Sequence, residues 1–120
     1  MRHLSQGFAI GALRRGEPIE QFLGPVTRGE EQGIQWVAIE PVGETFQIRL
    51  YAVREVTGVG DLNEFPPLDP DAEEDGIVLA ETADEVEALL LAERLAGAAR
   101  TRWVNFGVAA EDYRDLRPSA

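Results

Sequence analysis

The chain has 120 residues, which fits one domain spanning residues 1–120, and it contains no cysteine and no lysine. Twenty-two acidic residues against eleven arginines give a net charge of −11. This charge repels nucleic-acid phosphates and anionic membranes, so we expect neither as a partner and expect a basic protein surface instead. Because cysteine is absent and no apolar run approaches the roughly 20 residues that cross a bilayer, we expect a cytoplasmic protein.

The beginning of the chain is interpreted as a β-hairpin. Residues 7–13 alternate in part and are rich in glycine, which favours a strand over a helix. Residues 14–17 are typical of a turn, and residues 18–23 can return as a second strand with Pro18 at its first position. The polar residues 24–33 are interpreted as a loop.

The middle of the chain carries the clearest strand signals. Residues 34–40 are aromatic and β-branched, and residues 45–56 alternate between apolar and polar side chains. The proline-glycine turn at 41–44 between them predicts an antiparallel hairpin with one covered face and one wet face. The polar side chains of the second strand form either a partner surface or ordinary cross-strand pairs: Thr45, Gln47, Arg49 and Tyr51.

A helix is predicted over residues 83–96. Thr82 is a suitable N-cap residue, Glu85 follows three positions later as in a capping box, and Gly97 is a suitable stop. The predicted apolar stripe contains six residues: Val86, Leu89, Leu90, Leu91, Ala92 and Leu95.

Strands are predicted on both sides of this helix, at residues 76–81 and 101–107. If both join one sheet, the strand–helix–strand order places them parallel, and a short C-terminal helix follows at 109–116. The sequence therefore predicts an α+β fold. It consists of a mostly antiparallel sheet of five to six strands, one principal helix (83–96) packed on one face, and a short C-terminal helix.

Residues 61–75 form an acidic, proline-rich segment. They contain seven acidic residues, three prolines and no arginine, so we expect a long, solvated loop. Loops of this length within a compact domain are either functional or disordered. We predict that this loop binds the partner and that Phe65 serves as an apolar anchor. The predicted partner-binding residues are Asp61, Glu64, Phe65, Asp69, Asp71, Glu73, Glu74 and Asp75.

The chemistry of most enzyme classes is excluded by the residues that the chain lacks. Without lysine there is no Schiff base and no phosphate-gripping P-loop. The one histidine, His3, is expected on a mobile terminus. The two serines, Ser5 and Ser119, lie near the chain ends, so a hydrolase triad has no suitable nucleophile. We assign no catalytic residue and no cofactor.

A calcium loop is matched only in its first half. Asp71, Glu73, Asp75 and Gly76 stand at positions 1, 3, 5 and 6 of such a loop, but position 12 is Thr82 where a bidentate glutamate is required. We therefore assign no metal site. The tryptophans, Trp36 and Trp103, both fall in predicted strands, where core packing is the usual role and an interface is the alternative.

These observations favour a small, acidic, non-catalytic binding protein that recognises a basic protein surface, like an immunity or antitoxin-like inhibitor. A structural or homo-oligomerising module, in which a strand edge or the tryptophans form a homodimer interface, is the alternative. A carboxylate-based acid/base enzyme is the third hypothesis, and it requires two acids in a concave pocket with no arginine partner.

Overall fold

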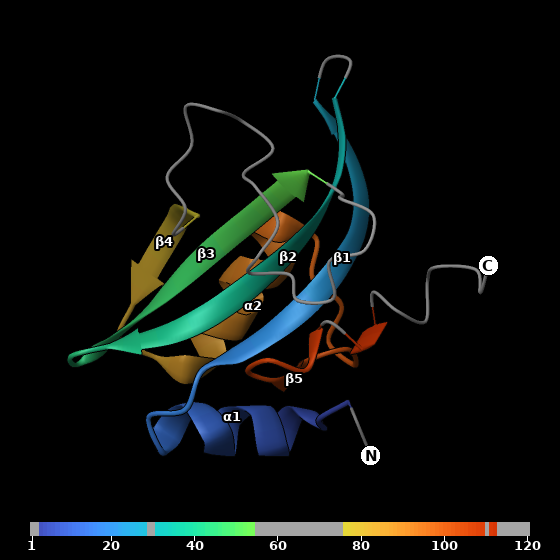
Figure 1. Ribbon diagram of the computed structural model, residues 1–120. Coiled ribbons are helices and arrows are strands. Elements are labelled where there is room, and N and C mark those ends of the chain that lie inside the picture. Colours follow the sequence, from blue (N-terminus) through green and yellow to red (C-terminus); the bar gives the residue numbers. More distant parts are fainter. Residues whose placement is uncertain (1–2, 29–30, 55–75, 110, 113–120) are drawn as a thin grey trace.

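The computed structural model describes residues 3–28, 31–54, 76–109 and 111–112 of the chain. These residues form a five-stranded antiparallel sheet and two helices, so the predicted α+β class is confirmed (Figure 1). The elements in chain order are α1 (Gln6–Arg14), β1 (Ile19–Arg28), β2 (Glu31–Val42), β3 (Thr45–Arg54), β4 (Ile77–Thr82), α2 (Glu85–Ala96) and β5 (Val104–Asn105).

The strands lie in the order β4-β3-β2-β1-β5, and every neighbouring pair is antiparallel. Because three strands alternate in direction between them, β4 and β5 run the same way at opposite edges of the sheet. The direction expected from the strand–helix–strand order therefore holds, although the two strands are not neighbours. Strand β5 has only two residues, where the sequence predicted a strand over residues 101–107.

Helix α2 covers one face of the sheet and builds the main core (Figure 1). Its buried face consists of Ala88, Leu89 and Ala92, and the two alanines let the helix approach the strands closely. Trp103 is also buried in this core, just before β5, which confirms its packing role but not its place in a strand. The sheet and α1 complete the core with Ile19, Val37, Ile39, Ile48, Ala9, Ala12 and Leu13.

The first predicted hairpin is wrong, because residues 7–13 belong to helix α1. Ser5 caps the helix, its Oγ accepting a hydrogen bond of 3.2 Å from the Phe8 backbone N–H. Ala9, Ala12 and Leu13 are buried at helical spacing, and this burial outweighs the low helix propensity of the glycines. The second half of the hairpin survives as the start of β1.

The predicted loop at residues 24–33 is also wrong, because β1 continues to Arg28 and β2 begins at Glu31. A bulge at Gly24, with φ of 108°, interrupts the ladder between the two strands. Pro25 is tolerated because, among the described residues, β5 pairs with β1 only at Ile19 and Glu20. The side of β1 away from β2 is therefore an edge at Pro25.

Helix α2 begins two residues later than predicted. Asp84, and not Thr82, is the N-cap, and its carboxylate accepts a 2.8 Å hydrogen bond from the Glu87 backbone N–H. Gly97 ends the helix as predicted, with φ of 74°. The predicted apolar stripe is corrected, because Val86, Leu90 and Leu95 are 39%, 47% and 47% exposed.

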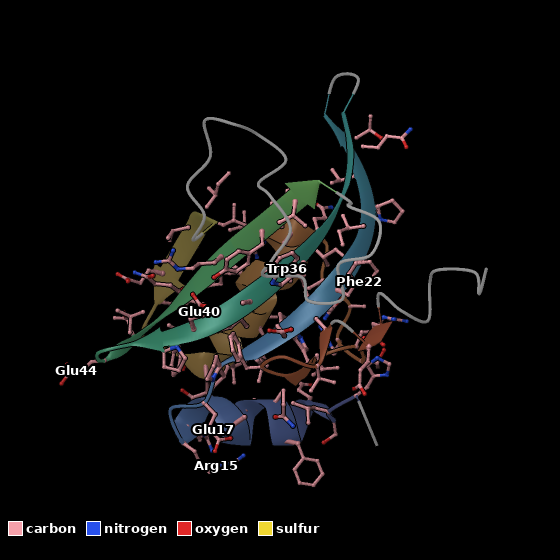
Figure 2. The ribbon with its side chains drawn as sticks, viewed as in Figure 1. Arg15, Glu17, Phe22, Trp36, Glu40 and Glu44 are labelled. Carbon is pink, nitrogen blue, oxygen red and sulfur yellow. The ribbon has the colours of Figure 1, made fainter. Side chains whose placement is uncertain are left out.

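The other face of the sheet carries a second apolar cluster beside a polar region. Phe22 and Trp36 lie opposite each other on β1 and β2 (Figure 2), and the Trp36 ring stacks on Tyr51 with ring centroids 5.0 Å apart.

At the C-terminal end, residues 109 and 111–112 are helical, and the rest of the predicted helix at 109–116 lies outside the described residues.

Candidate functional site

The predicted partner-binding loop lies outside the part of the chain that the structure describes. This applies to all eight of its residues: Asp61, Glu64, Phe65, Asp69, Asp71, Glu73, Glu74 and Asp75. Within the described ranges, no group of three or more histidine, aspartate or glutamate side chains is placed to hold a metal ion.

Four exposed carboxylates gather at one end of the sheet, and we call this group the acidic corner: Glu44, Glu81, Asp84 and Glu87. Glu44 lies at the tip of the β2–β3 turn (Figure 2), where the two strands close with Val42 opposite Thr45. Pairing of Phe46 with Thr82 brings the end of β4 beside the start of β3. Helix α2 begins directly afterwards, so three elements contribute to the same corner.

Two carboxylates of the acidic corner accept hydrogen bonds, but neither forms an ion pair with another described residue. The Asp84 side chain caps α2, and Glu81 accepts a 3.0 Å hydrogen bond from Gln47 Nε2. No arginine of the described part of the chain forms an ion pair with any of the four. The two arginines on neighbouring elements bind other acids, since Arg14 pairs with Glu85 and Arg49 with Glu40.

An apolar pair borders the acidic corner on the outer surface of α2. Val86 and Leu90 are one helical turn apart, on the side of the helix opposite the buried Ala88 and Ala92. Glu87 of the acidic corner lies between them in the sequence. An exposed apolar pair beside unneutralised charge is an arrangement typical of a binding surface with a central anchor and a polar rim.

The polar side chains of β3 form cross-strand contacts. Gln47 donates to Glu81 of β4 and accepts a 2.9 Å hydrogen bond from Arg49. Arg49 binds Glu40 of β2 at 3.0 Å, and the Tyr51 hydroxyl donates to the same carboxylate at 3.0 Å. The predicted alternative of ordinary cross-strand pairing therefore describes these side chains.

A groove of about 690 Å³ lies between His3, β1, the connection after α2 and Asp112. His3 lines it and contacts the buried Asp112, with Nε2 at 2.9 and 3.1 Å from the two carboxylate oxygens. His3, which the sequence placed on a mobile terminus, therefore has a partner 109 residues away. Arg102 approaches the same buried carboxylate at 3.9 Å. The remaining lining residues are Gln21, Phe22, Leu23, Gly24, Pro25, Gly97 and Ala99.

The polar groups of this groove bind one another. His3 and Arg102 both face Asp112, while the Gln21 amide donates to the Ala99 carbonyl at 2.8 Å and accepts from its N–H at 2.6 Å. Among the described residues that line the groove there is no serine, no threonine and no second carboxylate. Its described side chains therefore tie the N-terminal segment, β1 and the α2–β5 connection together, and they form no pair of acids for catalysis.

The sequence predicted neither the His3–Asp112 contact nor the acidic corner, because both depend on residues that are far apart in the chain. His3 and Asp112 are 109 residues apart, and no local pattern links them. Of the acidic corner, Asp84 and Glu87 are close together in the sequence, at the start of α2, where carboxylates suit the helix dipole. Their meeting with Glu44 depends on the β3–β4 register, which the sequence does not specify.

No protein-family model, curated protein or solved structure matches the chain. Among the described residues, neither helix has the length and apolar character needed to cross a membrane. The site must therefore be interpreted from its own geometry and charge.

Proposed function

We propose that the protein is a non-catalytic binding protein that recognises a basic protein surface, as an immunity or antitoxin-like inhibitor does. One observation carries the proposal: the acidic corner presents four exposed carboxylates without arginine partners among the described residues, in a chain of net charge −11. Unpaired carboxylates of one sign attract a basic surface over about a Debye length and speed its encounter.

The apolar pair beside the corner supports a specific complex as well as a fast encounter. Charge at the rim of an interface mainly changes the association rate, whereas buried apolar anchors slow dissociation. Val86 and Leu90 would serve as such anchors, with the acidic corner as the rim. The acidic segment 61–75 would add charge of the same sign, and the proposed partner-binding residues there remain part of the proposal.

The composition of the groove supports a binding role over catalysis. An acid/base enzyme that uses carboxylates needs two acids of different pKa facing one substrate. The described lining residues include one carboxylate, Asp112, which is already in contact with His3 and Arg102. A cytoplasmic location, expected because the chain has no cysteine, belongs to the same proposal.

The proposal is tested by capturing the partner from the native cell and measuring its binding kinetics over a range of salt concentrations. The variant Glu44→Gln/Glu87→Gln removes two charges from the corner without changing side-chain shape. The control Glu17→Gln/Glu93→Gln removes two charges from carboxylates that already pair with Arg15 and Arg100. We expect a slower association and a flatter salt dependence for the first variant only.

A parallel variant tests the acidic segment. Replacing Asp71, Glu73, Glu74 and Asp75 with serine should also slow association and flatten its salt dependence. A captured partner without a basic surface, or kinetics that none of these variants changes, would contradict the proposed function.

The alternative, a homo-oligomerising module, would use the edge strand β4. Light scattering over a range of concentrations distinguishes the two, because a tight dimer that salt does not dissociate supports the module. A monomer at low and high salt supports the binding protein.

A further inference from the structure

Strand β4 is an edge strand with an unused side. It pairs with β3, and no other strand lies beside it among the described residues (Figure 1). Its six residues form no backbone hydrogen bond on the outer side within the part of the chain that the structure describes. Every second N–H and C=O of such an edge points outward and is available to a further strand.

The side chains of β4 do little to protect this edge. Natural edge strands are blunted by lysine, proline or shortness. Residues Ile77–Thr82 include no proline, the chain has no lysine, and the one charged residue of the strand is Glu81. Ile77 and Val78 are 50% and 45% exposed and point to opposite faces, so an added strand would find apolar contacts on both.

A bulge limits how a further strand can pair. Ile48 lies opposite Ala80 and Arg49 opposite Val78, so Leu79 is the extra residue of β4. Extended backbone remains on both sides of Leu79. At the other edge of the sheet, β5 has only two residues. The free side of β1 beyond them is interrupted by the bulge before Gly24 and by Pro25, which protect it from a further strand.

The charge beside this edge defines what it can accept. Glu81 lies on the strand, Asp84 and Glu87 follow it directly, and Glu44 lies at the neighbouring turn, all exposed. A strand that adds to β4 must therefore place its end beside Thr82 within a Debye length of several unneutralised carboxylates. Basic side chains are favoured there, and acidic ones are repelled.

We propose that the partner adds an extended basic segment to the outer edge of β4, as a sixth strand of the sheet. Main-chain hydrogen bonds to residues 77–82 hold the segment, apolar side chains contact Ile77 and Val78, and basic side chains face the acidic corner. This inference rests on the proposed function and names its mode of recognition. A second copy of the chain is a poor occupant, because each copy carries a net charge of −11 and would bring its own acidic corner to the edge.

The test uses three synthetic ten-residue peptides and the full-length protein labelled with nitrogen-15. The first peptide alternates lysine with valine. The second has the same sequence with every backbone nitrogen methylated, which removes the donors of both edges while keeping all side chains. The third alternates glutamate with valine. Binding is measured by fluorescence anisotropy, and the site is located from amide chemical-shift changes.

We expect the first peptide to bind, with the largest shift changes at residues 77–82. The methylated peptide should bind at least about tenfold more weakly, because it loses several main-chain hydrogen bonds. The acidic peptide should not bind. In the protein, Val78→Lys should weaken binding of the first peptide, and Phe106→Lys should not, since Phe106 is 56% exposed beside the other edge of the sheet.

Two outcomes overturn the inference, and they are distinguishable from failure of the proposed function. Equal binding of the methylated and unmethylated basic peptides, or shift changes away from β4, rejects strand addition and leaves recognition of basic surfaces standing. A salt-resistant dimer that Val78→Lys dissociates would assign the edge to a second copy. Absence of binding by both basic peptides and by the captured partner's basic segment would contradict the proposed function itself.

Discussion

The Nε atom of Arg14 donates a 2.6 Å hydrogen bond to Oε1 of Glu85, joining the last turn of α1 to the first turn of α2. Each side chain lies at the helix end that its charge favours, since cations stabilise helix C-termini and anions helix N-termini. The contact spans 71 residues of sequence and fixes how the two helices meet. The contact also neutralises Glu85, a carboxylate that lies next to the acidic corner.

The first prediction concerns the pH dependence of stability. The hydrogen bond from Arg14, first among the causes, holds the pKa of Glu85 below its ordinary value. The stabilisation is therefore present above the pKa of the unfolded chain and is lost as pH falls through the lowered pKa of the folded protein. Arg14→Gln should lower the thermal midpoint at neutral pH, and its difference from wild type should narrow in acid.

Calorimetry from neutral pH to about pH 3 checks this prediction. Arg15→Gln is the matched control, because Arg15 pairs with Glu17 two residues away in an exposed turn (Figure 2). We expect little change in its thermal midpoint. A gap between wild type and Arg14→Gln that stays constant across this pH range would show that the contact does not act through the Glu85 carboxylate.

The second prediction concerns Gly76, which directly precedes β4 and has φ of 78°. A Cβ atom there would lie 2.8 Å from the Leu50 carbonyl oxygen and 2.9 Å from Tyr51 Cδ1, so backbone would have to move. Gly97 has nearly the same φ, 74°, but no atom within 4 Å of its Cβ position. Gly97→Ala should cost about 1–2 kcal/mol, the cost of a left-handed residue with a side chain, and Gly76→Ala clearly more.

Urea unfolding of the two variants gives the comparison directly. Equal losses of unfolding free energy would mean that the close approach of Gly76 to β3 adds nothing to the cost of its conformation. A larger loss for Gly76→Ala would confirm that β4 is seated tightly on β3 where the strand begins.

The third prediction concerns Gln21, whose side-chain amide bonds both the N–H and the C=O of Ala99. Gln21 is buried, and its contacts attach the connection after α2 to β1. Gln21→Leu should cost about 1–3 kcal/mol because two backbone groups lose their partner. Gln32→Leu, at an exposed position of β2, should change the unfolding free energy by less than about 0.5 kcal/mol.

Hydrogen exchange tests whether the loss is local. In Gln21→Leu the Ala99 amide should lose protection more than the amides of β2 do. Uniform loss of protection over the whole sheet would contradict the local role given to Gln21.

The elements predicted correctly are those whose signal is local. Residues 45–56 alternate cleanly over most of β3, and Gly97 provides a helix stop that needs no tertiary contact. Helix α1 was missed because its glycines suggested a strand, and burial of Ala9 and Leu13 against the sheet is invisible in the sequence. The loop predicted at 24–33 failed for a similar reason, since a bulge lets a strand continue past Gly24.

Of the candidate site, only the negative sign of its charge was predictable from the sequence. Composition showed where negative charge accumulates, but the corner needs the strand pairing that places Glu44 near Glu81. Helical periodicity likewise did not identify the outer face of α2, because apolar residues occur all around this helix. The face of α2 that contains Ala88 and Ala92 packs on the sheet, because small side chains allow close approach. Leu90 therefore lies on the exposed face of the helix.

The last prediction uses this orientation of α2. Ala92 is fully buried, so Ala92→Leu forces extra volume between helix and sheet and should cost about 1–3 kcal/mol. Leu90 is 47% exposed, so Leu90→Ser should change the unfolding free energy by much less. If the apolar pair anchors the proposed partner, Leu90→Ser should nevertheless speed dissociation of the complex. Urea unfolding and dissociation kinetics of the same variant separate the two roles: a folded protein with unchanged dissociation would remove Leu90 from the interface.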